Sequence, residues 1–428
     1  MEAWLLVNLG GANVLKSKLP VLVSFLLLLA CESSTNSQQK AKAYSGNQRP
    51  LPPAPVKSAS AKPVIKKPSV KPAAAGESDL LLADGLPERL LIGFWQNFDT
   101  STAKFVKLSE VAPPVSAGKA KWDIISVAFA ESIDANHNIG FKPFSGYASD
   151  QAFKDDVKKV QAQGQKVLIA IGGGSGPITL DNDIKTTNFV NSVSKIITDF
   201  GFNGVEIDFA GQSVFFEDGD TDINAPTSPT IVNTIKALND LRLRFGKNFV
   251  ISLSPETFFV QTGFEAYGAL GNPDKRAGAF LPIIQALNKN GNLTLLHVQN
   301  YNSGPVMGLD EVTRAAGTAE FTISMVEMLI QGFAITNNTD PKLRFDGVSA
   351  EKVALGLPAT ADAGSGFITN AETKKAFLCL QKGQSCPFPL KNVAGYSDLR
   401  GIMSWNINWD TLENREFSDA QRTLLDSL

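Results

Sequence analysis

Two acidic residues on alternate positions of one apolar segment are the side chains best placed for chemistry in this chain of 428 residues. In segment 204–210, Glu206, Asp208 and Ala210 alternate with three apolar residues. A period of two is typical of a β-strand, so these three side chains point to one face. Near-continuous apolar runs flank the segment, so we expect both faces of the strand to be covered. Buried carboxylates are costly unless they are paired or have a task, which makes Glu206 and Asp208 candidate functional groups.

This segment resembles the signature strand of glycoside hydrolase family 18, the chitinases and their relatives. The family pattern is D-G-x-D-x-D-x-E, and this chain reads N-G-V-E-I-D-F-A at 203–210. Asn203 and Glu206 stand at the first two Asp positions, Asp208 keeps the third, and Ala210 stands where the family carries its proton-donating Glu. Four further segments resemble the family, the last three its bacterial chitinase D-like branch: K-V-L-I-A-I-G-G-G at 166–174, L-S-P-E at 253–256, Q-N-Y-N at 299–302 and M-S-W-N-I-N-W-D at 403–410.

The resemblance implies a mechanism assisted by the substrate, an exception to the two-carboxylate scheme of most glycosidases. The 2-acetamido oxygen of the sugar attacks the anomeric carbon while a Glu protonates the leaving oxygen. By this resemblance Asp208 orients the acetamido group, Glu206 is its deeper partner, and Tyr301 hydrogen-bonds the acetamido carbonyl. Trp405 forms the floor of the sugar site. The general acid position is occupied by Ala210, which has no proton to give.

Other acids are alternatives for the missing proton donor. Glu206 shares the face of Ala210, but four strand residues of about 3.3 Å each place it roughly 13 Å deeper. A general acid must lie within hydrogen-bond reach, so Glu206 is excluded. Three acids of the following loop and one at the end of the next strand remain: Glu217, Asp218, Asp220 and Glu256.

Two functions of different classes therefore stay open. The first is a surface protein that binds chitin or other N-acetylglucosamine glycans with lost or much reduced hydrolysis. The second is an active chitinase or endo-N-acetylglucosaminidase that cleaves β-1,4 bonds with an acid from another position.

The elements that position these residues recur along the chain. Eight short apolar runs alternate with helical patterns after about residue 85, which predicts an α/β fold, a (β/α)₈ TIM barrel over residues 87–428. A doubly wound open sheet is the alternative. The expected strands are Leu90–Phe98, Asp123–Glu131, Lys166–Gly174, Gly204–Ala210, Asn248–Thr257, Leu295–Asn302, Lys352–Thr360 and Gly401–Asp410. The expected helices are Asp150–Gln163, Thr186–Phe200, Thr230–Phe245, Ala277–Leu287, Ala316–Gln331 and Asn370–Leu380.

The carboxyl ends of the expected strands carry aromatic residues beside amides and acids. Barrel enzymes place their sites at these ends. Sugar rings stack on aromatic faces, and hydroxyl and acetamido groups bind polar partners. We therefore predict substrate contacts from one residue or more of five strand ends: Trp95, Phe129, Glu256, Gln299, Asn302 and Trp405.

The amino-terminal region is typical of a lipoprotein. The apolar run 19–30 follows Lys16 and Lys18 and is too short for a membrane span of about 20 residues. Leu28–Cys31 resembles a bacterial lipobox, which implies a signal peptide over 1–31 and a lipid on Cys31. With Glu32 next, the resemblance favours an anchor at the bacterial outer membrane or cell surface. Residues 32–86 are rich in Pro, Lys, Ala and Ser, and we expect a disordered tether.

Composition argues against several other classes. The formal net charge is −2 and the excess of acid lies after residue 86, so we expect no nucleic-acid partner. The glycine run 172–176 fits neither a dinucleotide nor a P-loop pattern, so we expect no cofactor. His137 and His297 are far apart and no Cys/His cluster exists, so we expect no metal and interpret His297 as a satisfied core residue. We expect Cys379 and Cys386 to be bonded, and the protein to be a monomer.

Overall fold

Eight parallel strands form the centre of the computed structural model, which describes residues 85–111 and 120–428. Their order in the sheet is β12-β13-β1-β2-β4-β5-β6-β7, and parallel bridges from Leu296 to Val353 and from Gln299 to Gly356 join the two edges. The result is a nearly closed barrel, which confirms the predicted (β/α)₈ fold over the open sheet. The strands are β1 (Leu90–Gln96), β2 (Ile124–Ser132), β4 (Lys166–Gly172), β5 (Gly204–Asp208), β6 (Val250–Leu253), β7 (Leu295–Leu296), β12 (Ala354–Pro358) and β13 (Gly401–Trp405).

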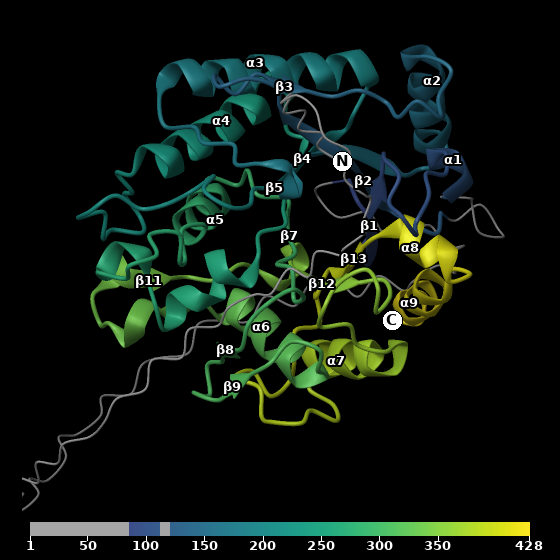
Figure 1. The fold of residues 1–428 in the computed structure, drawn as a ribbon. Coiled ribbons are helices and arrows are strands. Elements are labelled where there is room, and N and C mark those ends of the chain that lie inside the picture. Colours follow the sequence, from purple (N-terminus) through teal and green to yellow (C-terminus); the bar gives the residue numbers. More distant parts are fainter. Residues whose placement is uncertain (1–84, 112–119) are drawn as a thin grey trace, which may run out of the picture. The chain divides into compact units, whose positions relative to one another are not determined.

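Helices surround these strands (Figure 1). They are α1 (Leu108–Val111), α2 (Asp150–Gln161), α3 (Asp183–Phe200), α4 (Pro229–Phe245), α5 (Leu281–Lys289), α6 (Ala319–Gln331), α7 (Asn370–Lys382), α8 (Ile407–Leu412) and α9 (Glu416–Asp426). Each of the six predicted helices is present. Side-chain caps set several starts: Asn182 accepts a hydrogen bond from the Lys185 amide at α3, and Thr369 and Glu372 form a capping box at α7.

Five two-residue strands lie outside the eight. Strand β3 (Ile139–Gly140) extends β2 as an antiparallel partner. Two small antiparallel pairs form from β8 (Val306–Met307) with β9 (Thr313–Arg314) and from β10 (Phe333–Ala334) with β11 (Arg344–Phe345). These pairs belong to the segments that link the later strands and helices.

Two apolar cores hold the barrel together. One fills its interior and includes Ile92, Phe94, Leu168 and Met403. The other lies between the strands and the helices and includes Trp95, with the apolar faces of α2 to α7. All seven residues of β1 are buried, because each face of the strand meets one of these cores.

Glycines at β4 and β5 allow the signature strand to lie close to its neighbours. A Cβ atom at Gly204 would lie 2.2 Å from the carbonyl oxygen of Val250 on β6, and one at Gly172 would lie 2.2 Å from that of Asp208. Gly172 also has φ +115°, which an L side chain rarely adopts. The register pairs Ala170 with Glu206 and Gly172 with Asp208, so small residues of β4 stand beside both acids.

Seven of the eight predicted strands are shorter in the structure, and two of them show the reason. Gly401–Asp410 was expected as one strand, but β13 ends at Trp405 and α8 begins at Ile407. The Asn406 side chain ends the strand, because it accepts hydrogen bonds from the amides of Asn408 and Trp409 and so starts the helix. Leu295–Asn302 contains only the two-residue β7, and beyond it single bridges at Gln299 continue the pairing.

The disulfide expected between Cys379 and Cys386 is present, at the end of α7. The predicted signal peptide over 1–31, Cys31 and nearly all of the predicted 32–86 tether lie outside the described residues. Within 85–111 and 120–428, no helix is both long enough and apolar enough to cross a membrane.

Candidate active site at the carboxyl ends of the strands

A cavity of about 480 Å³ opens at the carboxyl ends of the barrel strands. Most of its lining comes from strand ends or from the residues that directly follow them, so the closure of the barrel brings the side chains together. The lining residues are Phe98, Phe129, Glu131, Gly173, Gly174, Asp208, Ala210, Glu256, Gln299, Tyr301, Asn302 and Trp405.

Asp208, the last residue of β5, is the central acid of this cavity. Gln299 Nε2 donates hydrogen bonds of 2.8 Å to Asp208 Oδ1 and of 2.8 Å to the Ser254 carbonyl, which fixes both side chains. The pKa of Asp208 is raised to about 8, mainly by burial and in addition by the charges of Glu206 and Glu256, while the Gln299 hydrogen bond opposes them. Asp208 is therefore a protonated carboxylic acid at neutral pH.

Tyr301 is a second buried polar group of the cavity, with 4 % of its surface exposed. Burial raises the pKa of its phenol well above the usual value, and the charges of Asp208 and Glu256 act in the same direction. The hydroxyl is therefore a hydrogen-bond donor at any physiological pH. A donor beside a carboxylic acid suits an amide ligand, which offers both a carbonyl and an N–H group.

Aromatic rings form one side of the cavity. The rings of Trp405 and Phe129 stack, with centroids 5.7 Å apart and planes inclined by 22°. Phe94, in the core of the barrel, meets the edge of Trp405 at 5.5 Å and supports it from below. Trp405 and Phe129 are both partly exposed. A rigid, half-exposed aromatic face of this kind suits a flat apolar surface such as a sugar ring.

Comparisons of this chain with known protein families and structures agree with this geometry. The family model for glycosyl hydrolases family 18 matches residues 91–375. The chain belongs to glycosyl hydrolase family 18. It is 41% identical to Chitinase Chi52 of Paenibacillus xylanexedens over 79% of this chain, and it spans 62% of that relative's length. It is 41% identical to a probable class II chitinase of Arthroderma benhamiae, over 72% of this chain and 93% of the relative.

A solved structure extends the family 18 likeness to three dimensions. The crystal structure of a chitinase from Chromobacterium violaceum matches with a TM-score of 0.70 at 32% identity. The match covers 80% of this chain and 84% of that protein. The predicted family is therefore confirmed by sequence and by fold.

Most of the predicted sugar contacts meet in the cavity. Phe129, Glu256, Gln299, Asn302 and Trp405 all line it, as do Asp208 and Tyr301. The side chain of Asn302 is also bound to the loop after β12, because its Oδ1 accepts hydrogen bonds from the amide and hydroxyl of Ser365.

Trp95 and Glu206 do not reach the cavity. Trp95 has no exposed surface, donates its indole N–H to the Val106 carbonyl at 3.0 Å and stacks on Phe153 behind the strand. Its neighbour Phe94 points into the barrel instead, and Phe98 lines the cavity. Glu206 has no exposed surface either and lies below Asp208 on the inner face of β5.

The structure separates the alternative acids. Glu217 is exposed and outside the cavity lining, Asp218 pairs with Lys275 at 2.7 Å, and Asp220 accepts hydrogen bonds from two backbone amides. Glu256 does line the cavity. Burial raises the pKa of the Glu256 carboxyl, and the charge of Arg276 opposes this.

Sequence reasoning did not assign four of the lining residues to the site. Phe98 and Glu131 belong to the expected strands one and two, and Gly173 and Gly174 end the third. Their position at the carboxyl ends of the expected strands was the signal that could have identified them as site residues. Among residues 85–111 and 120–428, no group of three or more His, Cys, Asp and Glu is placed to hold a metal.

Proposed function

We propose that this protein binds chitin or another polymer of N-acetylglucosamine in the cavity, and that it hydrolyses the polymer slowly or not at all. The observation that carries the proposal is Ala210. It lines the cavity with Asp208, Tyr301 and Trp405, at the position where the family pattern has its proton-donating Glu. The groups that hold an acetamido sugar are thus kept while the side chain that protonates the leaving oxygen is absent.

The retained groups have complementary tasks toward an acetamido sugar. Trp405 supplies the apolar surface under the ring. The Tyr301 hydroxyl donates to the acetamido carbonyl, and Asp208, whose Oδ1 already accepts from Gln299, presents its second carboxyl oxygen to the acetamido group. Each interaction is a ground-state contact, so binding does not require the missing acid.

The experiment compares binding and cleavage of the sugar on one preparation of the protein. Calorimetry with chitotetraose measures affinity, and chromatography of the same mixture measures cleavage products. The proposal predicts saturable binding with a cleavage rate at least about 10²-fold below that of an active family 18 chitinase assayed in parallel. Cleavage at a comparable rate contradicts the loss of activity, and absence of binding contradicts the proposal as a whole.

A second candidate function is hydrolysis with Glu256 as the proton donor. Glu256 is the one acid of the four sequence alternatives that lines the cavity, and its raised pKa favours the protonated form that a general acid requires. The relatives named chitinases also favour an active enzyme. In that case Glu256→Gln abolishes cleavage, whereas Glu217→Gln, a matched change at an exposed acid, leaves it unchanged.

The cellular location is also a proposal. We infer that Cys31 is lipidated and anchors the protein to the outer membrane or cell surface, on the basis of the Leu28–Cys31 motif. Intact protein is then expected to partition into detergent, and Cys31→Ser to remain in the aqueous phase. Mass spectrometry that finds residues 19–30 retained in the mature protein contradicts this proposal.

A further inference from the structure

The end of β2 extends one wall of the cavity beyond the barrel. The two neighbours of β2 in the sheet pair with it only as far as Ala128 and Ala130. The strand continues to Ser132, and its last residues pair with the two-residue β3 instead. The amide of Ile133 donates to a carbonyl of the returning strand at 2.9 Å and prolongs this pairing by one position. The resulting β2–β3 hairpin, residues 131–140, projects from the carboxyl end of the barrel, where the cavity opens.

The two faces of the β2–β3 hairpin differ. Ser132 and Ile139 lie opposite each other on one face. Ile139 is buried, and its amide donates to Ser192 Oγ on α3 at 2.9 Å, so that β3 lies beside this helix (Figure 1). Alternation of side chains along the strand places Glu131 and Ile133 on the other face. Since Glu131 lines the cavity, Ile133 lies on the face that continues the cavity wall.

Ile133 is a large apolar residue that the fold does not bury. Its surface is 69 % exposed. The side chain lies over Gly140, because a Cβ atom at Gly140 would stand 2.5 Å from Ile133 Cγ2. The glycine therefore gives the isoleucine its place on the hairpin. Single exposed apolar residues are common on protein surfaces, so the informative feature is the position of Ile133 next to the cavity wall.

Hydrogen bonds fix the turn of the β2–β3 hairpin. Asp134 accepts hydrogen bonds from the amides of Asn136 and Asn138 and from the Asn138 side chain. His137 Nε2 accepts a hydrogen bond from the Thr179 amide at 3.1 Å, which joins the turn to the segment before α3. A side chain on a backbone that is already ordered costs little further entropy when it binds a ligand.

We propose that the outer face of the β2–β3 hairpin is a second contact area for the polymer, where Ile133 packs against a sugar unit that lies beyond the cavity. Ile133 is two residues after Glu131, about 7 Å further along the strand. The apolar face of a pyranose ring matches the isoleucine, and the carboxyl oxygens of Glu131 accept hydrogen bonds from sugar hydroxyl groups. The inference rests on the proposed function, because it assumes that the cavity holds the same polymer.

The test measures affinity as a function of oligomer length. Calorimetry compares chitobiose, which is too short to reach from Trp405 to the tip of the hairpin, with chitohexaose. Ile133→Ser is expected to weaken hexamer binding about threefold and to leave dimer binding unchanged, because only the hexamer covers the isoleucine. Ile133→Trp offers a larger stacking surface and is expected to strengthen hexamer binding about threefold or more.

The matched control is Leu243, another exposed apolar residue. Its surface is 83 % exposed, and it lies in the last turn of α4, just before β6 begins at the amino end of the barrel. Leu243→Ser is expected to leave both affinities unchanged. If Ile133→Ser does not fold, Ile133→Thr, which keeps the branched shape but adds a hydroxyl, takes its place.

Equal hexamer affinities in wild type, Ile133→Ser and Ile133→Trp overturn the proposal. A loss of the same size for dimer and hexamer in Ile133→Ser also overturns it, because the change would then act on the cavity itself. Binding that depends on Trp405 but not on Ile133 leaves the proposed function intact and removes only the hairpin contact. Absence of binding for both oligomers contradicts the proposed function and this inference together.

Discussion

The two ends of the barrel each hold a cavity, and the two cavities have opposite character. The one at the carboxyl ends is lined by the acids Glu131, Asp208 and Glu256 and by aromatic rings. The other, of about 260 Å³, lies where β6, β7, β12 and β13 begin. It is lined by four cationic residues and one acid: Arg242, Lys247, Lys352, Arg400 and Glu351.

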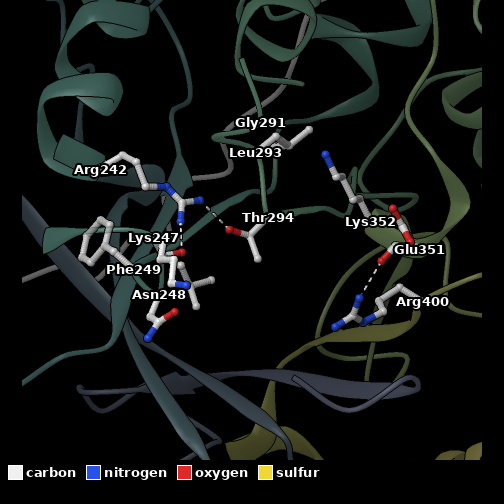
Figure 2. Close-up of a pocket in the computed structure, with 11 residues that line it drawn as sticks. Arg242, Lys247, Asn248, Phe249, Gly291, Leu293, Thr294, Glu351, Lys352 and Arg400 are labelled. Atoms are coloured by element: carbon white, nitrogen blue, oxygen red, sulfur yellow. Dashed lines mark hydrogen bonds between the residues drawn. The ribbon is translucent and has the colours of Figure 1, made fainter. Parts of the chain in front are cut away.

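The polar groups of the second cavity are used by the protein itself (Figure 2). Arg242 donates to the Lys247 and Asn292 carbonyls at 2.6 Å each and to Thr294 Oγ1 at 3.0 Å. Arg400 donates to the Glu351 carbonyl at 2.9 Å. The Arg242 bonds tie α4 to the segment before β7, and the Arg400 bond joins the segments before β13 and β12. At the other end, Asp208 and Tyr301 carry shifted pKa values and face the cavity. We therefore assign the candidate site to the cavity at the carboxyl ends of the strands. The cavity at the amino ends contributes to stability.

The strongest test of this division introduces an acid at position 210, where we propose that the proton donor is missing. Ala210→Glu is expected to raise chitotetraose hydrolysis by about 10²-fold or more, because the new side chain enters the cavity that holds Asp208. Since Glu206 is longer than the family's Asp, we expect a larger gain with the double change Ala210→Glu and Glu206→Asp. Chromatographic product analysis measures the rate.

The matched control is Ala210→Gln, which has the same size but no proton to give. Equal rates for the Glu and Gln variants would show that position 210 is not the place of the acid. Efficient cleavage by wild type that Glu256→Gln abolishes would lead to the same conclusion.

Asp208 makes the carboxyl end a source of pH-dependent instability. Its pKa is about 8 in the folded protein, against a usual value of 3.8, so the folded state keeps a proton that the unfolded chain loses. Stability therefore falls as the pH rises from about 4 to 8. Asp208→Asn is expected to remove this contribution and raise the free energy of unfolding by about 5 kcal/mol at pH 8, and by little at pH 4. Denaturant titrations at both pH values measure it, and an equal effect at the two values contradicts it.

Removing a cation at the amino end should affect stability alone. Arg242→Met keeps the apolar stem but leaves three acceptors without their donor, which is expected to lower the free energy of unfolding by about 2 kcal/mol. Affinity for chitotetraose is expected to stay the same. Lys236→Met on the same helix breaks only a surface pair with Asp240 and serves as the control. Weakened sugar binding in Arg242→Met would break the division between the two ends.

The smallest expected effect concerns the aromatic wall. Trp405→Ala is expected to weaken chitotetraose binding by about 1 kcal/mol, roughly fivefold in Kd, because the sugar loses its stacking surface. Trp409→Ala removes an indole that does not line the cavity and should leave the affinity unchanged. Calorimetry measures both, and unchanged affinity in Trp405→Ala places the sugar elsewhere.

The sequence predicted the barrel and most of the cavity because both follow from local patterns. Apolar runs that alternate with amphipathic helices give the fold, and residues at the ends of parallel strands must meet at one end of a barrel. Gln299, Tyr301 and Trp405 were predicted in this way. The disulfide between Cys379 and Cys386 was predicted because the two residues are close in sequence and we expected a compartment that permits disulfides.

The sequence does not predict which side chains of a strand point into the barrel when the strand has no alternation of polar and apolar residues. Strand β1 has no polar side chain from Leu90 to Trp95, so its pattern did not tell whether Trp95 or Phe94 points inward. The neighbouring strands decide this when the barrel closes, and they place Trp95 behind the strand and Phe98 at the cavity.

By itself, the sequence determined the fold and the set of groups at the carboxyl ends, because these depend on periodicity and order along the chain, and the resemblance of its motifs indicated the family. Only the tertiary structure decided which acid reaches the cavity and what lies beneath Asp208. Glu256 and Glu217 were both alternatives for the proton donor, yet one lines the cavity and the other is exposed. The pairing of Glu206 with His297 joins strands that are not adjacent in the sheet. Such contacts across the interior depend on the curvature and register of the closed barrel, which no local pattern encodes.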